Sequence, residues 1–286
     1  MKPILARENS EKIFLGFALT ALVLTMLFLF TLLWDVVSDG LPKISSDFLS
    51  GYPSRKPSEA GILPALAGTA YLMALNAIIA VPIGLFAAVY LEEYATKSYL
   101  SRILELNIAN LAGVPSIIYG LLGLQLFVRF ADLGRSVAAG ALTLSLLILP
   151  VIIIASREAL RQVPKGFREA SLALGATKWQ TIWNQVIPNA LPGVMTGCIL
   201  ALSRAIGETA PLICLGALTY VAFVPDSVFS AFTALPIQAF NWVSRPQAAF
   251  HDNAAGAILV LLILLVILNS FAVFIRMKFQ KQYTQG

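Results

Sequence analysis

The sequence predicts an all-α integral membrane protein with six transmembrane helices. Of its 286 residues, 58% are hydrophobic and 12% are charged, and the mean hydropathy is +0.80. A soluble domain carries about 25% charged residues, so this chain lacks the polar surface of a soluble enzyme, a disordered chain or a secreted disulfide scaffold. Long uncharged runs recur along it, and such runs must be helical in lipid, which offers the backbone no hydrogen-bond partner.

The first predicted span covers residues 13–34. Its apolar stretch exceeds the roughly 7–15 residues of a signal peptide, and no small-residue cleavage site follows Trp34. We therefore expect a retained membrane anchor.

The next three spans are predicted from the uncharged runs 60–91, 106–128 and 136–156. Pro115 interrupts the run 106–128, the third span of the chain. The break either leaves Ser116 and nearby backbone amides free to bind an anion or only kinks the helix for packing. Gly120 and Gly123, in the same run, predict close approach of another helix.

The longest inner segment, residues 157–188, is unlike the other connections. It begins with basic residues, and its periodicity predicts an amphipathic helix over 167–174, a left-handed turn at Gly175 and a second helix over 176–187. We expect one face of the second helix to carry Trp179, Ile182, Trp183 and Val186. Two interpretations fit: a surface that another protein grips, or helices lying among lipid headgroups.

The fifth span is predicted from about Ala190 to Tyr220 and contains two charges, Arg204 and Glu208. A spacing of four places both on one helix face. Each costs at least about 2.5–3.5 kcal/mol in lipid, so we expect them to face the protein interior and each other. The pair either fixes helix packing or marks an anion path, because a guanidinium matches phosphate oxygens. Gly193 and Gly197 again predict close helix packing.

Residues 227–244 contain Pro236, Gln238 and Asn241, which predicts an interfacial loop with short helices rather than a span. The sixth span then covers 253–275. With an inner N-terminus, thirteen of the twenty lysines and arginines fall on inner segments and six on outer ones, as the positive-inside rule requires. The outer six are Lys43, Arg55, Lys56, Arg129, Arg135 and Arg245.

The chemistry-bearing residues are sparse. No lysine follows a glycine, so the chain has no P-loop, and one histidine and the two cysteines Cys198 and Cys214 make neither a metal cluster nor a disulfide framework. We expect no catalysis, no metal and no cofactor on this chain. ATP, if used, belongs to a separate subunit.

The segment Glu169–Ala170–Ser171, followed by Gly175 and then Pro188, resembles the EAA loop of bacterial ABC importer permeases. In that family the loop seats the ATPase subunit. Ser171 replaces the usual alanine, and Gln185 replaces an apolar residue. The resemblance implies a type I ABC importer permease fold, with Glu169, Ala170, Ser171, Gly175 and Pro188 as the ATPase-coupling residues.

The stretches SRAIGETAPL (203–212), GVPSIIYGLLG (113–123) and PIGLFAAVYLEEY (82–94) are similar to the membrane subunits of phosphate importers, the PstA group above all. The likeness covers about residues 65–277. It implies a non-enzymatic subunit importing inorganic phosphate, and it carries the translocation path over to Arg204 and Glu208. Thr209 and Ser116 join that path as candidates.

The same resemblance implies the partners: a PstC-like second permease subunit, two PstB-like ATPase subunits that bind ATP and Mg, and an extracytoplasmic PstS-like phosphate-binding protein. The location is the bacterial inner membrane with both termini cytoplasmic. The expected organisation is a cytoplasmic N-terminus (1–12), a first helix and outer loop (13–60), a permease core of five transmembrane helices (61–277) with its coupling segment at about 157–188, and a cytoplasmic tail (278–286).

Three other functions remain open from the sequence. The substrate is another oxyanion, such as sulfate or molybdate; or the chain is a secondary anion carrier in which Glu208 binds a coupling proton; or it is a membrane sensor or scaffold. Secondary carriers tend to contain inverted repeats, and the sequence has no clear repeat.

Overall fold

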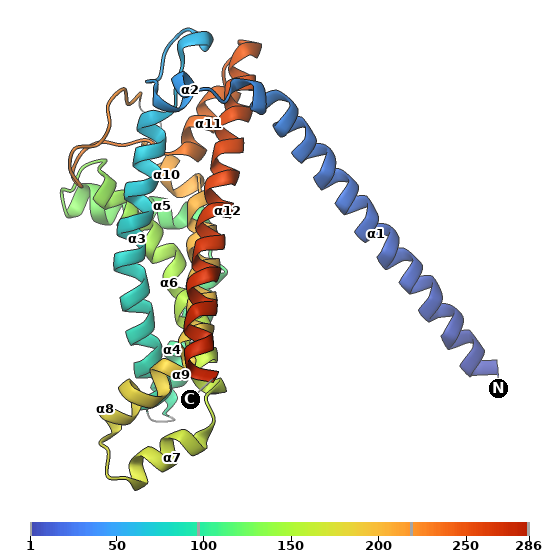
Figure 1. The fold of residues 1–286 in the computed structure, drawn as a ribbon, viewed down its shortest axis with the longest axis vertical. Coiled ribbons are helices and arrows are strands. Elements are labelled where there is room, and N and C mark those ends of the chain that lie inside the picture. Colours follow the sequence, from blue (N-terminus) through green and yellow to red (C-terminus); the bar gives the residue numbers. More distant parts are fainter. Residues whose placement is uncertain (1, 96–97, 218–219, 285–286) are drawn as a thin grey trace.

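The computed structural model describes residues 2–95, 98–217 and 220–284, and it is a bundle of helices from which one long helix departs (Figure 1). Five helices are long and apolar enough to cross a membrane, and the count reaches the expected six when one bent pair of helices is taken as a single span. Residues 1, 96–97, 218–219 and 285–286 lie outside the described part. They belong to the expected cytoplasmic N-terminus, an expected inner loop, the fifth span and the cytoplasmic tail.

Helix α1 (Lys2–Gly40) leaves the bundle and extends toward the end of the molecule where α7 lies (Figure 1). None of its most apolar window is buried. It meets the bundle at Gly40, where a Cβ atom would collide with the backbone of Ala255 on α12 (Ala248–Thr284). Residues 13–34 of α1 form an exposed, mostly apolar surface that lipid or another protein chain can cover.

At the opposite end, three short helices follow α1: η1 (Leu41–Lys43), α2 (Ser46–Ser50) and η2 (Pro57–Glu59). The hydroxyl of Ser45 caps α2 by accepting from the Phe48 amide at 3.1 Å. Phe48 is buried beside Trp242 of α11 (Leu235–Val243). This contact fastens the connection between α1 and the bundle.

The centre of the bundle is built by α3 (Leu63–Val89), α6 (Val137–Gln162) and α9 (Ile187–Gly207). A Cβ atom on Gly197 would overlap Ala155 of α6, and one on Gly193 would overlap Ala159. The predicted close approach at both glycines is confirmed. Because lipid tails are as apolar as the side chains, such close packing is a main source of helix association in membranes.

The third span is broken rather than kinked. It consists of α4 (Tyr99–Ala112), then α5 (Ser116–Gly123) continuing into the π-helical turn η4 (Leu124–Phe130), with a bend of 101° between the two parts. Pro115 lies at the break because it lacks an amide hydrogen and cannot continue α4. Across the break, the Tyr119 hydroxyl donates to the Leu111 carbonyl at 2.8 Å.

Two amphipathic helices follow α6, as expected, with different bounds. The first is α7 (Lys165–Ala173). The second, α8 (Lys178–Thr181), starts after Thr177, which forms a reciprocal capping box with Gln180. It then passes through the π-helical turn η5 (Ile182–Val186) directly into α9, so it is the start of the fifth span and not a separate helix.

The prediction that Trp179, Ile182, Trp183 and Val186 share one face of this second helix is wrong. Ile182 and Val186 are buried in the bundle, whereas Trp179 and Trp183 are about half exposed and stack on each other with ring centroids 5.6 Å apart. The two pairs occupy neighbouring strips of one helix, and only one strip faces the bundle.

Helix α11 lies within the segment expected to be an interfacial loop. With nine residues it is too short to cross a membrane, as predicted. It is nevertheless buried within the protein rather than lying on the surface, since Ile237 and Trp242 are each 1% exposed.

The packing at Gly197 leads to a stability prediction. Gly197→Leu forces a large side chain against Ala155, and overpacking of this kind costs about 1–3 kcal/mol. We expect a lower melting temperature for the detergent-solubilised protein. Gly16→Leu is the matched control because nothing lies within 4 Å of its Cβ position on α1. Equal melting temperatures for the two variants would contradict the assigned helix packing.

Candidate functional site

Arg204 and Glu208 form the expected ion pair, with Arg204 Nε 3.3 Å from Glu208 Oε1. The expectation that both lie on one helix is wrong. Helix α9 ends at Gly207, and Glu208 has an extended backbone (φ −75°, ψ 117°). Pro211 follows in the first turn of α10 (Ala210–Leu215), where a missing amide hydrogen costs nothing. The pair therefore lies at a break between two helices.

The pair is only partly withdrawn from solvent in the single chain. The Glu208 side chain is 17% exposed and the Arg204 side chain is 43% exposed. Nε is the Arg204 nitrogen that bonds Glu208; the terminal Nη1 and Nη2 atoms make no hydrogen bond with any of the described residues. Arg204 thus keeps a two-pronged donor available for an anion beside its carboxylate partner.

The two broken helices meet each other. Helices α5 and α10 lie side by side within the height of α3 (Figure 1), and the Gly120 position on α5 leaves no room for a Cβ beside Pro211 and Cys214. Ser116 is the first residue of α5 and is partly exposed. Thr209 is the N-cap residue of α10, and its hydroxyl lies 3.4 Å from the Gly207 carbonyl. The site candidates 116 and 209 therefore each mark the start of a helix after a break.

Tyr119 is a site residue that the sequence analysis missed. It is buried on α5 and lies close enough to Arg204 for an electrostatic interaction. The sequence could have indicated Tyr119 by its position three residues after the candidate Ser116, since residues three apart share a helix face. Through Tyr119 the third span reaches the charged pair of the fifth.

The arrangement suits an anion held by hydrogen bonds and charge, without covalent chemistry. Among the described residues no group of three or more histidine, cysteine, aspartate or glutamate side chains is placed to hold a metal ion. Cys198 and Cys214 are free thiols. The available ligands are the Arg204 guanidinium, hydroxyl groups and backbone amides at helix starts, which are typical of oxyanion sites.

The second candidate site is a groove between α7 and α8. It has a volume of about 600 Å³, and its walls include Phe167, Ala170, Ser171 and Gln185. Helix α7 buries none of its residues, and Leu174 is 90% exposed at its end. An exposed apolar groove of this kind is a surface that a protein partner or lipid can cover.

The expected coupling residues are arranged in two places. Glu169 and Ala170 are exposed on α7, and Gly175 forms the predicted left-handed turn with φ +87°. The Ser171 hydroxyl lies 2.9 Å from that of Thr181, so the serine at the usual alanine position ties α7 to α8. Pro188 is not in the groove. It lies in the first turn of α9, just after η5.

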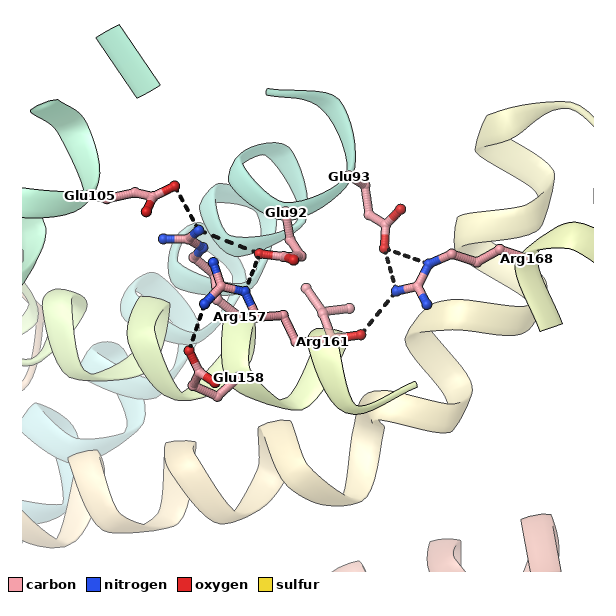
Figure 2. Close-up of polar contacts among 8 residues, drawn as sticks. Glu92, Glu93, Glu105, Arg157, Glu158, Arg161 and Arg168 are labelled. Atoms are coloured by element: carbon pink, nitrogen blue, oxygen red, sulfur yellow. Dashed lines mark hydrogen bonds and ion pairs between the residues drawn. The ribbon is translucent and has the colours of Figure 1, made fainter. Parts of the chain in front are cut away.

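A polar network at the same end of the molecule was not anticipated (Figure 2). Arg157 and Arg161 of α6 both bond Glu92, which belongs to the π-helical turn η3 (Tyr90–Tyr94) at the end of α3. Arg157 also bonds Glu105 of α4 at 2.9 Å. These ion pairs join residues 52 to 69 positions apart, so no local spacing in the sequence announces them.

Comparison with known proteins places these features in a family. The family described as the inner-membrane component of binding-protein-dependent transport systems matches residues 80–283. A phosphate transport system permease protein PstA 1 of Mycobacterium tuberculosis is 36% identical over 95% of this chain and 90% of its own length. A PstA phosphate permease of Haemophilus influenzae is 32% identical over 93% of each chain. Among solved structures, a chain of a bacterial alginate ABC transporter superposes with a TM-score of 0.68 at 14% identity, over 92% of this chain and 93% of that one.

The turn at Gly175 leads to a local prediction. Gly175→Ala places a side chain at φ +87°, where an L-residue costs roughly 1–2 kcal/mol. We expect the amides of α7 to exchange with deuterium about tenfold faster, since 1.4 kcal/mol corresponds to a factor of ten. Gly166→Ala, on the same helix with open space around it and an ordinary φ, is the control. Unchanged exchange in Gly175→Ala would contradict the strain argument.

Proposed function

The chain belongs to the family of inner-membrane components of binding-protein-dependent transport systems, and from that premise we propose that it is the permease subunit of an ATP-driven importer of inorganic phosphate. The observation that carries the proposal is the Arg204–Glu208 pair at the break between α9 and α10. The relatives that are named phosphate transport permeases support the choice of phosphate among the oxyanions.

The chemistry of Arg204 fits a transient phosphate contact. The two terminal nitrogens of a guanidinium match two oxygens of one phosphate, and the neighbouring Glu208 offsets part of the positive charge. A site of lone, unpaired arginines would hold a dianion too firmly, whereas conduction needs binding weak enough for release. Arg204 with its carboxylate partner meets both requirements.

The helix breaks supply the remaining ligands. The first amides of a helix have no intrahelical partner and carry partial positive charge, and broken helices in transporters aim such ends at anionic substrates. Ser116 and Thr209 stand at the starts of α5 and α10, and we assign their hydroxyls and the adjacent amides to the phosphate path. Tyr119 lies on the same helix as Ser116, within electrostatic range of Arg204.

The groove between α7 and α8 is the surface we assign to a separate ATPase subunit. Glu169 and Ala170 present themselves to that subunit from α7, while Ser171 and Gly175 set the angle between α7 and α8. Pro188 lies outside the groove, just after η5, and we assign to it the junction between α8 and the span that carries Arg204, where it lacks the amide hydrogen of an ordinary helical residue. The ATPase binds ATP and Mg, and its conformational change displaces the helices of the permease.

The full assembly we propose contains a second, PstC-like permease subunit, two PstB-like ATPase subunits and a PstS-like phosphate-binding protein outside the membrane. This chain forms half of the translocation path, because the Arg204 side chain is 43% exposed in the single chain and requires a second wall. Both termini and the α7–α8 groove lie on the cytoplasmic side, which agrees with the excess of basic residues there. The N-terminal end of α1 and the C-terminal end of α12 lie at the end where α7 lies (Figure 1).

ATP binding draws the two ATPase subunits together, and α7 moves with them. The motion reaches α9 through α8 and changes which side of the membrane can approach Arg204. This is rigid-body gating of helix bundles around a fixed site, driven by nucleotide instead of an ion gradient.

Arg204→Gln tests the path. Losing a charge-assisted contact worth about 1.5–3 kcal/mol lowers uptake of radiolabelled phosphate by roughly ten- to a hundredfold in vesicles that contain the assembled complex. Arg129→Gln removes a positive charge elsewhere and should transport normally. Full phosphate uptake by Arg204→Gln would overturn the assignment, and competition by excess sulfate or molybdate in the wild type would overturn the choice of phosphate.

Glu169→Lys tests docking of the ATPase on α7, where Glu169 is exposed next to Ala170 of the groove wall. Reversing an exposed charge at the contact with the ATPase should reduce co-purification of the ATPase subunit severalfold. A positive charge on the ATPase that attracts Glu169 would repel a lysine at this position. Glu59→Lys, an exposed glutamate at the opposite end of the molecule, is the control. If Glu169→Lys retained the ATPase and its phosphate-dependent hydrolysis, the groove would not be the docking surface.

A further inference from the structure

One arginine ties α7 to the end of α3. Arg168 lies on α7, and its Nη2 and Nε atoms donate to the same Glu93 oxygen, Oε1, at 2.7 and 3.1 Å (Figure 2). The Arg168 side chain is 21% exposed and the Glu93 side chain 11% exposed. An ion pair so far withdrawn from water is little screened by salt and holds a defined geometry.

The same guanidinium also closes the end of α6. Arg168 Nη1 donates to the Val163 carbonyl at 2.7 Å, and Nη2 donates to the Leu160 carbonyl at 2.9 Å. The last carbonyls of a helix have no intrahelical partner and attract a cation. A single side chain of α7 therefore bonds the ends of two helices of the central bundle.

The other contacts and chain connections of α7 join it to α6 and α8 rather than to α3. Its Ser171 hydroxyl bonds Thr181 of α8, and none of its residues is buried. Along the chain, Pro164 connects α7 to α6, and Gly175 connects it toward α8 and α9. Neither covalent route reaches α3, which comes far earlier in the sequence. Among the described residues, the hydrogen bonds from α7 to α3 are those between Arg168 and Glu93.

The turn η3 gives two adjacent carboxylates different partners. Glu92 bonds Arg157 and Arg161 of α6, and through Arg157 it is linked to Glu105 of α4. Glu93, the next residue, bonds α7. The Glu92 contacts make the ends of α3, α4 and α6 one block, and the Glu93 contact fastens α7 to that block.

We propose that Glu93 and Arg168 are positioning residues that transmit displacement of α7 to the end of α3. The inference rests on the proposed function, in which α7 contacts the ATPase. Without the pair, α7 still follows the ATPase, but the hydrogen bonds that then hold it to the joined ends of α3, α4 and α6 are those from Arg168 to α6, so this block follows α7 less completely. ATP hydrolysis then continues while less phosphate is moved for each ATP consumed.

The test uses the complete complex in proteoliposomes. ATP is supplied on the side of the membrane where the ATPase binds, and phosphate-loaded binding protein on the opposite side. Glu93→Gln keeps the size of the side chain and leaves the carbonyl bonds of Arg168 intact. We expect phosphate transported per ATP hydrolysed to fall about tenfold, as the ion pair becomes a weaker bond from the guanidinium to a neutral amide, while the ATPase co-purifies at the wild-type ratio. Glu158→Gln is the matched control, because it removes an exposed carboxylate bonded to Arg161 at the same end without touching α7.

A double-variant cycle excludes a general packing defect. Arg168→Gln should also lower transport per ATP, and adding Glu93→Gln to it should cause no further loss, since the two residues act through one contact. Losses that multiply in the double variant would overturn the proposal. So would a normal transport ratio in Glu93→Gln, or loss of the ATPase from that variant, which would make the pair part of the docking surface.

Failure of the proposed function has a different signature. A wild-type complex that takes up no phosphate with ATP, or that holds no ATPase, contradicts the importer assignment before any variant is compared. A wild type that imports phosphate, together with a Glu93→Gln variant of unchanged ratio, contradicts only the link.

Discussion

Lipid offers no hydrogen bonds to the peptide backbone, and this constraint governs the architecture. It makes every span helical, and it confines interruptions of a helix to places that the protein itself protects. The two interruptions that matter, before Ser116 and after Gly207, lie on helices that pack against each other, with Gly120 of α5 beside Pro211 of α10. Backbone groups freed by the breaks are therefore gathered near one charged pair, where an anion can use them.

The distribution of charge follows from the same constraint. Ion pairs at the ends of α3, α4 and α6 lie where water or another protein completes their solvation, and they hold the helix ends together. Within the span, a lone arginine would be costly, and Glu208 lowers that cost. The Arg204 side chain remains 43% exposed in the single chain, which agrees with the proposal that a second permease subunit covers this surface.

Patterns that depend on neighbours in sequence predicted much of the fold: the spans from long apolar runs, the turn at Gly175, and the close packing at Gly193 and Gly197. The pairing of Arg204 with Glu208 was predicted as well, although for a helical geometry that the break after Gly207 replaces. Such local patterns could not predict contacts between segments that are distant in the sequence. Glu93 and Arg168 are 75 positions apart, and nothing in either local sequence identifies the other as a partner.

The π-helical turn η5 sets the angular register between the two ends of one long helix. It is bridged by the Ile187 amide bonding the Ile182 carbonyl, five residues back, where an α-helix would bond four back. Each residue of an α-helix advances the rotation by roughly 100°. The single extra residue in η5 thus decides which way α8 points while the orientation of Arg204 stays fixed. Deletion of one residue there would turn α8, and the groove between α7 and α8, by roughly 100° relative to Arg204.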